Sequence, residues 1–245
     1  MMNKVSQYNK YLSYRKNELF LEDISLASIS EKFSTPAYCY SISQIEHNFM
    51  ILKKSFHKLK PMICYALKAN FNSKIIKTLS NLGSGIDVVS SGELEKSLSV
   101  GIDNKKIVFS GVGKTSREID VAIKKNIKQI NVESEEELKE IFESCKKLNK
   151  KINICLRVNP DIDAKTHEKI STGRSEDKFG ISNEKILKIF KRYEKNIFIN
   201  IIGLSIHIGS QIESLNPFQR AFKKIKKQIL NLRKEGFNIT TLDLG

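Results

Sequence analysis

Three residues whose side chains could take part in chemistry each follow a short apolar run: Lys68, Arg157 and His207. An amine at the end of an apolar strand is expected to be partly desolvated, which favours its neutral, nucleophilic form and lets it form a Schiff base. A guanidinium in such a place needs an anion or a carbonyl as partner, and an imidazole can stack on a ring or move a proton. Each also has an ordinary interpretation: a solvated lysine, a structural ion pair, or a histidine that fixes a loop.

Further polar residues and glycines lie at equivalent places. Asp87 falls within an apolar run, where it could orient Lys68 or a cofactor group, or serve as a helix N-cap or turn residue. The pair Gly209-Ser210 follows His207, and its N–H and hydroxyl groups can reach an anion. Gly245 follows the last apolar run. These residues therefore predict a small-molecule site assembled from several strand ends, and no cluster predicts a metal site.

Seven apolar runs, separated mostly by segments of helical periodicity, predict the elements that position these residues. The runs are 62–66, 86–89, 107–109, 130–132, 152–158, 202–206 and 241–244. Helices are predicted at Ile42–His57, Ser134–Leu148 and Pro217–Lys234, the second with the capping-box spacing of Ser134 and Glu137.

Alternation of strand and helix predicts parallel pairing with right-handed crossovers, as in a closed (β/α)8 barrel or a doubly wound sheet. The sequence contains neither a GxGxxG motif nor a Walker loop, which removes the commonest doubly wound signatures. A barrel also requires functional groups at the carboxyl ends of several strands, and the residues above meet that requirement. We therefore expect an α/β protein of the (β/α)8 TIM-type barrel class.

Composition excludes several functional classes. The net charge is +15, from 42 basic and 27 acidic residues, but lysines are abundant everywhere and accompany no nucleic-acid module, so we expect no nucleic-acid partner. There is no apolar run of 18 residues and Met1–Arg15 lacks the features of a secretory signal, so we expect no membrane association. Four cysteines without a CxxC pair fit a reduced, cytoplasmic setting.

Five ordered blocks resemble a known family. The block Tyr65–Asn70 is similar to the Schiff-base lysine motif of the group IV pyridoxal-phosphate-dependent decarboxylases, which have the alanine-racemase fold. The blocks Asp87–Leu94, Arg157–Pro160 and His207–Gln211 match further motifs of that family, in order. The segment 167–173, followed by 178–181, resembles the diaminopimelate decarboxylase branch. The resemblance covers roughly residues 19 to 245.

This resemblance implies roles for the individual residues. Lys68 would carry pyridoxal 5'-phosphate, His207 would stack on the pyridine ring, and Ser210 would bind the phosphate. Arg157 and Asp87 would belong to the network around the ring, and Gly245 would begin the phosphate-binding glycine run. The implied reaction is decarboxylation of meso-2,6-diaminopimelate to L-lysine and carbon dioxide, with the small amino acid as substrate and a homodimer as the full-length assembly.

The resemblance also implies a domain organisation. Residues 1–29 would pack on a carboxyl-terminal β-domain, and residues 30–245 would form the barrel as far as its seventh strand of eight. The β-domain, the eighth strand and its Glu-Pro-Gly-Arg motif are not in the sequence. Because such a barrel has unpaired edges, we expect this chain alone to be inactive and only marginally stable.

Three alternatives remain open at this point. The first is a single-domain pyridoxal-phosphate homeostasis protein, whose size is similar. The second is another decarboxylase of the same fold, acting on ornithine or arginine. The third is a non-catalytic regulatory or nucleic-acid-binding protein. The blocks at 65–70 and 167–173 favour the diaminopimelate branch over all three.

Overall fold

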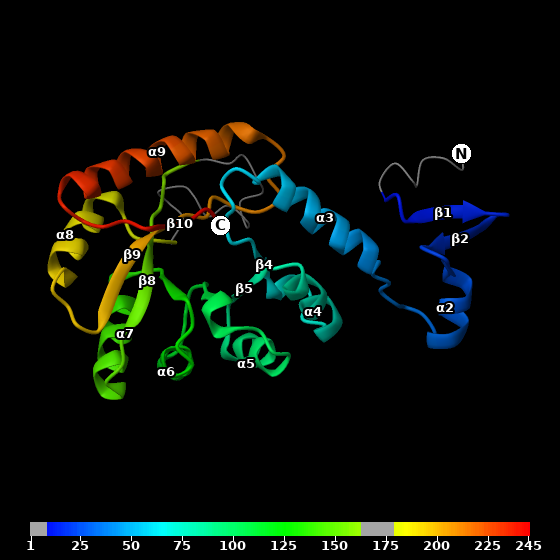
Figure 1. Cartoon of the computed structure of the whole chain (residues 1–245), viewed down its shortest axis with the longest axis horizontal. Helices are drawn as coiled ribbons and strands as arrows, with labels where there is room; N and C mark the ends of the chain where they lie inside the picture. Colours follow the sequence, from blue (N-terminus) through cyan, green and yellow to red (C-terminus); the bar gives the residue numbers. More distant parts are fainter. Residues whose placement is uncertain (1–8, 163–178) are drawn as a thin grey trace. The chain divides into compact units, whose positions relative to one another are not determined.

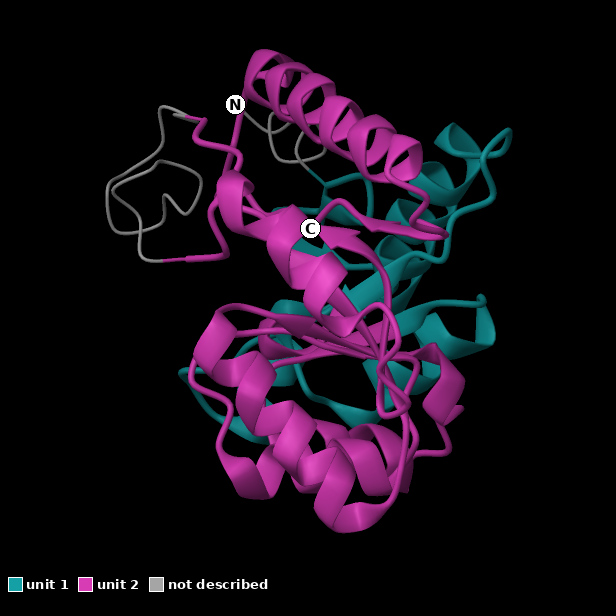
Figure 2. Ribbon diagram, turned by 90° about the vertical axis from the view of Figure 1, so that its left-hand side faces the viewer, with its two compact units in different colours: residues 1–65, 70–85 teal, residues 66–69, 86–245 magenta. Residues whose placement is uncertain are grey.

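The computed structural model describes residues 9–162 and 179–245, which form two compact units (Figure 2). The first unit takes its described residues from 1–65 and 70–85, and the second takes them from 66–69 and 86–245. Within the described part of the chain, no helix is long and apolar enough to cross a bilayer. The segment 167–173 and Lys178, which carry the resemblance to the diaminopimelate branch, lie outside the described residues.

In its described residues, the first unit contains a small antiparallel sheet and three helices. Its elements are β1 (Leu12–Arg15), β2 (Glu18–Leu21), β3 (Ile24–Ser25), α2 (Leu26–Phe33), α3 (Ile42–Ser55) and α4 (Ser73–Asn81). Helix α3 confirms the helix predicted at Ile42–His57, and it begins where the Ser41 hydroxyl accepts a hydrogen bond from the Gln44 N–H. Phe49 of α3 packs with Ile75 and Leu79 of α4 to form a core.

A sheet of seven strands runs through the chain in sequence order, and the pairs from β5 to β10 are all parallel. Strands β8, β9 and β10 lie side by side in Figure 1. Its strands are β4 (Cys64–Ala66), β5 (Gly85–Val88), β6 (Ile107–Phe109), β7 (Gln129–Val132), β8 (Ile152–Arg157), β9 (Ile199–Ser205) and β10 (Thr241–Asp243). Each strand was predicted from an apolar run. The sheet confirms the expected barrel class with seven of its eight strands.

The crossover segments between these strands are helical. Within the second unit they are α5 (Ser91–Ser99), α6 (Ser116–Lys124), α7 (Glu135–Leu148), α8 (Asn183–Tyr193) and α9 (Leu215–Lys234), with short 3-10 turns η1 (Leu67–Ala69) and η2 (Asn104–Lys106). The predicted capping box of α7 is only half formed. The Ser134 hydroxyl accepts from the Glu137 N–H, but the Glu137 carboxylate accepts a hydrogen bond from Lys114 Nζ at 2.8 Å. A buried ion pair has therefore replaced the second capping contact.

The core of the second unit consists of β-branched and aliphatic side chains on the strands. Ile86, Val88, Ile130, Val132 and Ile154 are fully buried. Strands in a parallel sheet that is covered on both faces are apolar along most of their length, and these strands follow that rule. The polar residues that interrupt them, described below, are consequently exceptions that need partners.

Strand β10 lies unusually close to β9 at one point. Gly203 pairs with Thr241, and a Cβ added at Gly203 would lie 1.8 Å from the Thr241 carbonyl oxygen. A side chain at this position would therefore force the two strands apart.

We expect Gly203→Ala to lower the free energy of unfolding by about 1–3 kcal/mol or more, because overpacking a rigid backbone contact cannot be relieved by a rotamer change. Urea unfolding followed by circular dichroism measures the effect. Gly92→Ala on helix α5 is the matched control, since the nearest atom to a Cβ there would be Ser90 Oγ, at 4.0 Å. The control should be neutral or stabilising by up to about 1 kcal/mol. Equal stability of the two variants would contradict the close approach.

Candidate active site

Lys68 lies in the 3-10 turn η1, directly after strand β4. Its neighbour Leu67 is fully buried and anchors the turn. Lys68 is exposed, which contradicts the partial desolvation expected from its place after an apolar run. The reason is that strand β4 ends at Ala66, so Lys68 lies in the following turn and not on the strand. Its availability to a ligand thus comes from exposure.

Asp87 is a half-buried carboxylate on β5. Its Oδ1 accepts a hydrogen bond from Ser110 Oγ at 2.5 Å. The pKa of Asp87 is raised to about 6, mainly by burial. The hydrogen bond from Ser110 lowers this pKa, and the negative charge of Asp243 raises it. Asp87 can therefore hold or release a proton near neutral pH.

Arg157 is the last residue of β8 and is buried with Glu133, which follows β7. Its Nη1 donates to both carboxylate oxygens of Glu133, at 2.9 and 2.8 Å, and its guanidinium lies over the Phe179 ring at 5.3 Å. Its Nη2 is buried and has no hydrogen-bond partner among the residues that the structure describes. A buried donor of this kind is costly unless a ligand accepts from it, so Arg157 combines a structural ion pair with a free donor.

A second buried ion pair lies next to the first. Lys114 Nζ donates to Glu137 Oε1 at 2.8 Å and to the backbone oxygens of Gly111 and Asn131, at 2.7 and 2.8 Å. Only 1% of the Lys114 side chain is exposed. The lysine thereby fixes the loop after β6 to β7 and to helix α7.

His207 follows β9, and its Nδ1 accepts a hydrogen bond from the Gly209 N–H at 3.2 Å. Because a backbone N–H can only donate, Nδ1 is unprotonated and the neutral ring carries its proton on Nε2. Burial, followed by the positive charges of Arg157 and Lys68, lowers the pKa of His207 to about 4. The ring is therefore neutral at physiological pH, as stacking on a cofactor ring requires.

Ser210 and Gly245 complete the predicted set. Ser210 is exposed in the loop that follows His207, so its hydroxyl is accessible. Gly245 has φ +84°, which glycine adopts without strain, and its N–H donates to Asp243 Oδ1 at 3.0 Å. A Cβ at Gly245 would lie 2.8 Å from the Ile206 carbonyl oxygen and 3.5 Å from the His207 Cβ. The last residue of the chain therefore lies against the histidine.

Electrostatic interactions show which of these residues come together. The charge of Lys68 acts on both Asp87 and His207, and the charge of Arg157 acts on His207. Asp243, at the end of β10, acts on Asp87 and on His207 as well. Residues at or near the ends of β4, β5, β8, β9 and β10 thus share one electrostatic environment.

Sequence reasoning missed several polar residues of this region. Asn131 and Gln129 are buried within an apolar strand, and Ser110, Lys114 and Asp243 follow or end other strands. The available signal was an amide side chain inside an apolar run, in Ile130-Asn131-Val132. A polar residue at a fully buried strand position requires a hydrogen-bond partner and so marks a network.

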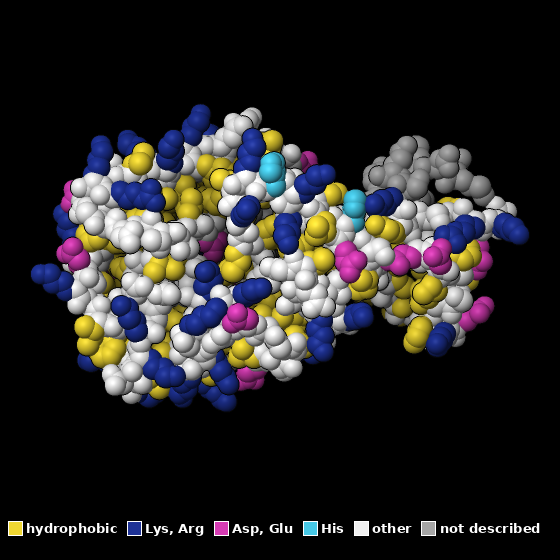
Figure 3. Space-filling model, viewed as in Figure 1, with side chains coloured by type: hydrophobic (Ala, Val, Ile, Leu, Met, Phe, Trp, Pro, Cys, Tyr) yellow, Lys and Arg dark blue, Asp and Glu magenta, His cyan; other side chains and the backbone are white. Residues whose placement is uncertain are grey.

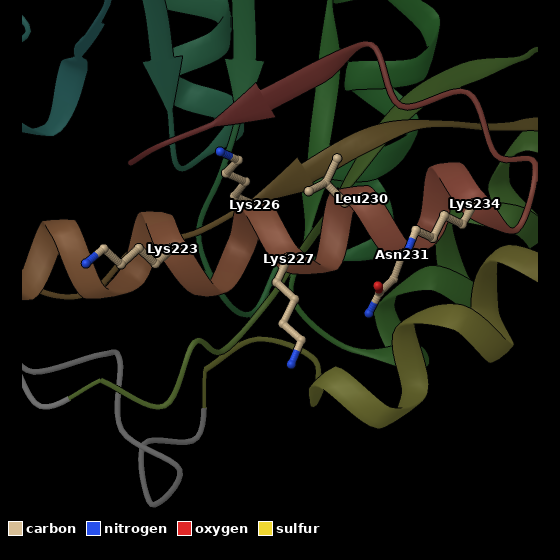
Figure 4. Close-up of a pocket in the computed structure, with 6 residues that line it drawn as sticks. All are labelled: Lys223, Lys226, Lys227, Leu230, Asn231 and Lys234. Atoms are coloured by element: carbon tan, nitrogen blue, oxygen red, sulfur yellow. The ribbon is translucent and has the colours of Figure 1, made fainter.

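Elsewhere on the described surface, charged side chains do not gather at one place in a comparable way. Lys and Arg side chains are spread over the face shown in Figure 3. Lys223, Lys226, Lys227 and Lys234 line a shallow pocket on α9, but Figure 4 shows the amines of the first three pointing in different directions. Among the residues that the structure describes, no group of His, Cys, Asp and Glu is arranged to hold a metal ion.

Comparison with known proteins decides the family. Residues 42–245 match the family model of the pyridoxal-dependent decarboxylase, pyridoxal binding domain. The chain belongs to this pyridoxal-dependent decarboxylase family. The diaminopimelate decarboxylase of Aquifex aeolicus is 42% identical over 244 residues, which is all of this chain and 58% of the relative. That of Vibrio cholerae is 41% identical over 236 residues, 96% of this chain and 57% of the relative.

Solved structures of this decarboxylase family agree. Diaminopimelate decarboxylase from Helicobacter pylori, complexed with L-lysine, has a TM-score of 0.85 and 41% identity, over 88% of this chain and 55% of that one. The enzyme from M. jannaschii, in co-complex with L-lysine, has a TM-score of 0.88 and 35% identity, over 97% and 57%. The chain therefore spans somewhat more than half the length of the relatives it matches.

The residues fit the pyridoxal group that the family model names. The exposed amine of Lys68 can react with an aldehyde, and the neutral ring of His207 can stack on an aromatic ring. Arg157 Nη2, which has no partner in the described part of the chain, can donate to an anionic or hydroxyl oxygen. The backbone at Gly245 leaves no room for a side chain beside His207.

We expect His207 to titrate at about pH 4 and to carry its neutral-form proton on Nε2, which nitrogen-15 NMR measures directly. Between pH 4 and the unfolded pKa of about 6.5, the unfolded state binds the proton more readily than the folded state. Stability from this group is therefore full above about pH 6.5 and is lost as pH falls toward 4.

Relative to His207→Asn, wild-type protein should lose on the order of 1–2 kcal/mol of unfolding free energy between pH 7 and pH 5. A midpoint near 6.5, or the same pH dependence in both proteins, would show that the ring is not buried as described.

Proposed function

We propose that this protein decarboxylates meso-2,6-diaminopimelate to L-lysine and carbon dioxide, using pyridoxal phosphate attached to Lys68. The observation that carries the proposal is the arrangement of Lys68, Asp87, Arg157 and His207 at strand ends that share one electrostatic environment. The family assignment and the relatives named diaminopimelate decarboxylase support the choice of substrate. Two structurally similar relatives are complexed with L-lysine, the product of the proposed reaction.

Each residue has a proposed task. The amine of Lys68 attaches the cofactor, and the neutral ring of His207 stacks on the pyridine. The Ser210 hydroxyl and the backbone at Gly245 bind the phosphate. Arg157 uses Nη1 to hold Glu133 and has Nη2 available for an acceptor on the ligand. These tasks agree with an exposed Lys68, a neutral His207 ring and a buried donor at Arg157 Nη2.

Bound pyridoxal phosphate supplies the electron sink for decarboxylation. The contribution of the chain is orientation and charge placement. Asp87 has a pKa of about 6, so it exchanges a proton near neutral pH within electrostatic reach of Lys68. His207 stays neutral, so it adds no positive charge beside the pyridine ring on which it is proposed to stack.

Three properties of the whole protein also belong to the proposal. We propose that residues 1–29 pack on a carboxyl-terminal β-domain and that residues 30–245 are the cofactor-binding barrel part. We propose that the full-length protein is a homodimer and acts in the cytoplasm. The family resemblance supports the domains and the dimer, and the four free cysteines fit a reducing compartment. Light scattering of the protein as its gene encodes it tests the dimer.

Borohydride reduction in the presence of pyridoxal phosphate should fix the cofactor on Lys68, because this exposed amine lies among the groups proposed to bind it. Peptide mass spectrometry locates the label. Lys68→Arg should abolish labelling, while Lys74→Arg, an exposed lysine on helix α4, should leave it unchanged. Labelling of another lysine in the wild-type protein would refute the assignment.

The protein as its gene encodes it should release carbon dioxide from meso-diaminopimelate and form L-lysine. The measurement is carbon dioxide release with diaminopimelate, ornithine and arginine compared under the same conditions. Diaminopimelate should be turned over fastest. Faster turnover of ornithine or arginine would refute the substrate while leaving the cofactor and the fold intact.

A further inference from the structure

A hydrogen-bonded chain connects the carboxylates of Asp87 on β5 and Asp243 on β10. Asn131 on β7 lies at its centre and is only 5% exposed. Its Nδ2 donates to Ser110 Oγ at 3.0 Å and to Asp243 Oδ2 at 2.8 Å. Ser110 Oγ in turn donates to Asp87 Oδ1 at 2.5 Å. One amide thus links two acidic groups from opposite parts of the sheet.

The hydrogen bonds of this chain have one consistent set of directions. The Asn131 Oδ1 accepts from Gln129 Nε2 at 3.0 Å, so the amide nitrogen faces Ser110 and Asp243. Its two hydrogens are then both used. Because Ser110 Oγ already accepts one of them, its single hydrogen is left for Asp87. Gln129 and Asn131 are two positions apart on one strand, which places both side chains on the same face.

These directions favour the ionised form of Asp87, since an ionised carboxylate only accepts hydrogen bonds. The groups that act on Asp87 have opposing effects. Burial and the negative charges of Asp243 and Glu93 favour the protonated form, whereas the Ser110 hydroxyl and the positive charge of Lys68 favour the ionised form. Asn131 acts on one influence of each kind. It orients the Ser110 hydroxyl, which favours the ionised form of Asp87, and it donates to Asp243, whose charge favours the protonated form.

We propose that Asn131 is a positioning residue of this site, which directs the Ser110 hydroxyl to Asp87, partly neutralises Asp243, and so sets the proton affinity of Asp87 opposite Lys68. The inference rests on the proposed function, because it assigns Asn131 a role in the site where Lys68 would hold the cofactor. It concerns the protonation of a side chain of this chain, so it can be tested with and without the cofactor.

The test is carbon-13 NMR titration of the Asp87 carboxyl, assigned by its absence in Asp87→Asn. Asn131→Leu removes both donated hydrogen bonds, and Asn131→Asp places a further negative charge between Asp87 and Asp243. Both variants should raise the Asp87 midpoint by about 1 pH unit or more, a tenfold increase in proton affinity. Asn153→Leu is the matched control, because Asn153 is a strand asparagine hydrogen-bonded to Asn200 on β9 and to Lys128 O. It should leave the midpoint unchanged.

Ser110→Ala keeps the test decisive where an Asn131 variant fails to fold. It removes the hydroxyl through which Asn131 acts on Asp87, so it should raise the Asp87 midpoint. Adding Asn131→Leu to Ser110→Ala should then raise this midpoint by less than Asn131→Leu does in the wild-type protein. A purely structural role would lower the melting temperature and leave the Asp87 midpoint in place, which would overturn the proposal. An unchanged midpoint in Ser110→Ala would overturn it equally.

The pH dependence of pyridoxal phosphate absorbance on the wild-type protein and on Asn131→Leu gives a second measurement. If wild-type protein takes no borohydride label on Lys68, the proposed function fails, and the Asp87 titration still decides the role of Asn131. If the label forms and the Asp87 midpoint does not move, the inference about Asn131 fails alone.

Discussion

Parallel pairing of neighbouring strands is the constraint on which the site depends. In a parallel sheet every strand ends at the same edge, so residues far apart in the sequence meet there without any dedicated loop to bring them together. Arg157, Ser205 and Asp243 illustrate this, because Ser205 pairs with both of the others across β8, β9 and β10. Closely packed strands make the pairing possible, as Gly203 shows against Thr241. The chemistry at the strand ends is thus a consequence of backbone geometry several residues away.

Charge at these strand ends is organised in pairs. Glu133 is held by Arg157, and Glu137 is held by Lys114, with little of any of these side chains exposed. Removing one partner of such a pair would leave a buried charge without compensation, which is strongly destabilising. The pairs therefore fix the loops around the site. Lys68 and the second nitrogen of Arg157 are left outside these pairs and are available to a ligand.

The sequence predicted the strands of the sheet and their parallel pairing, because apolar runs separated by helical segments are a local signal. Its six candidate site residues were chosen because they lie in or follow those runs, and their roles stay predictions. It did not predict that Lys68 would be exposed, since the exposure of a side chain depends on the turn that follows the strand. It also missed the partner of Glu137. A serine followed three positions later by a glutamate indicates a capping box, but Lys114 lies 23 positions away and takes the carboxylate. The partners in the network through Asn131 give no local signal either, because they come from three other parts of the sheet.

The hydrogen bond between Asn131 and Asp243 joins residues that are 112 positions apart. Contacts of such separation close large loops, and their entropic cost must be met before they stabilise anything. Strands β5 to β8 can pair with their neighbours as each crossover forms, whereas this contact requires β10 to have docked on β9. We therefore expect the polar network to be among the last parts of the second unit to order during folding. On the ribosome, Asp243 also emerges after nearly all of the described sheet, so the site would be assembled only once synthesis has passed strand β10.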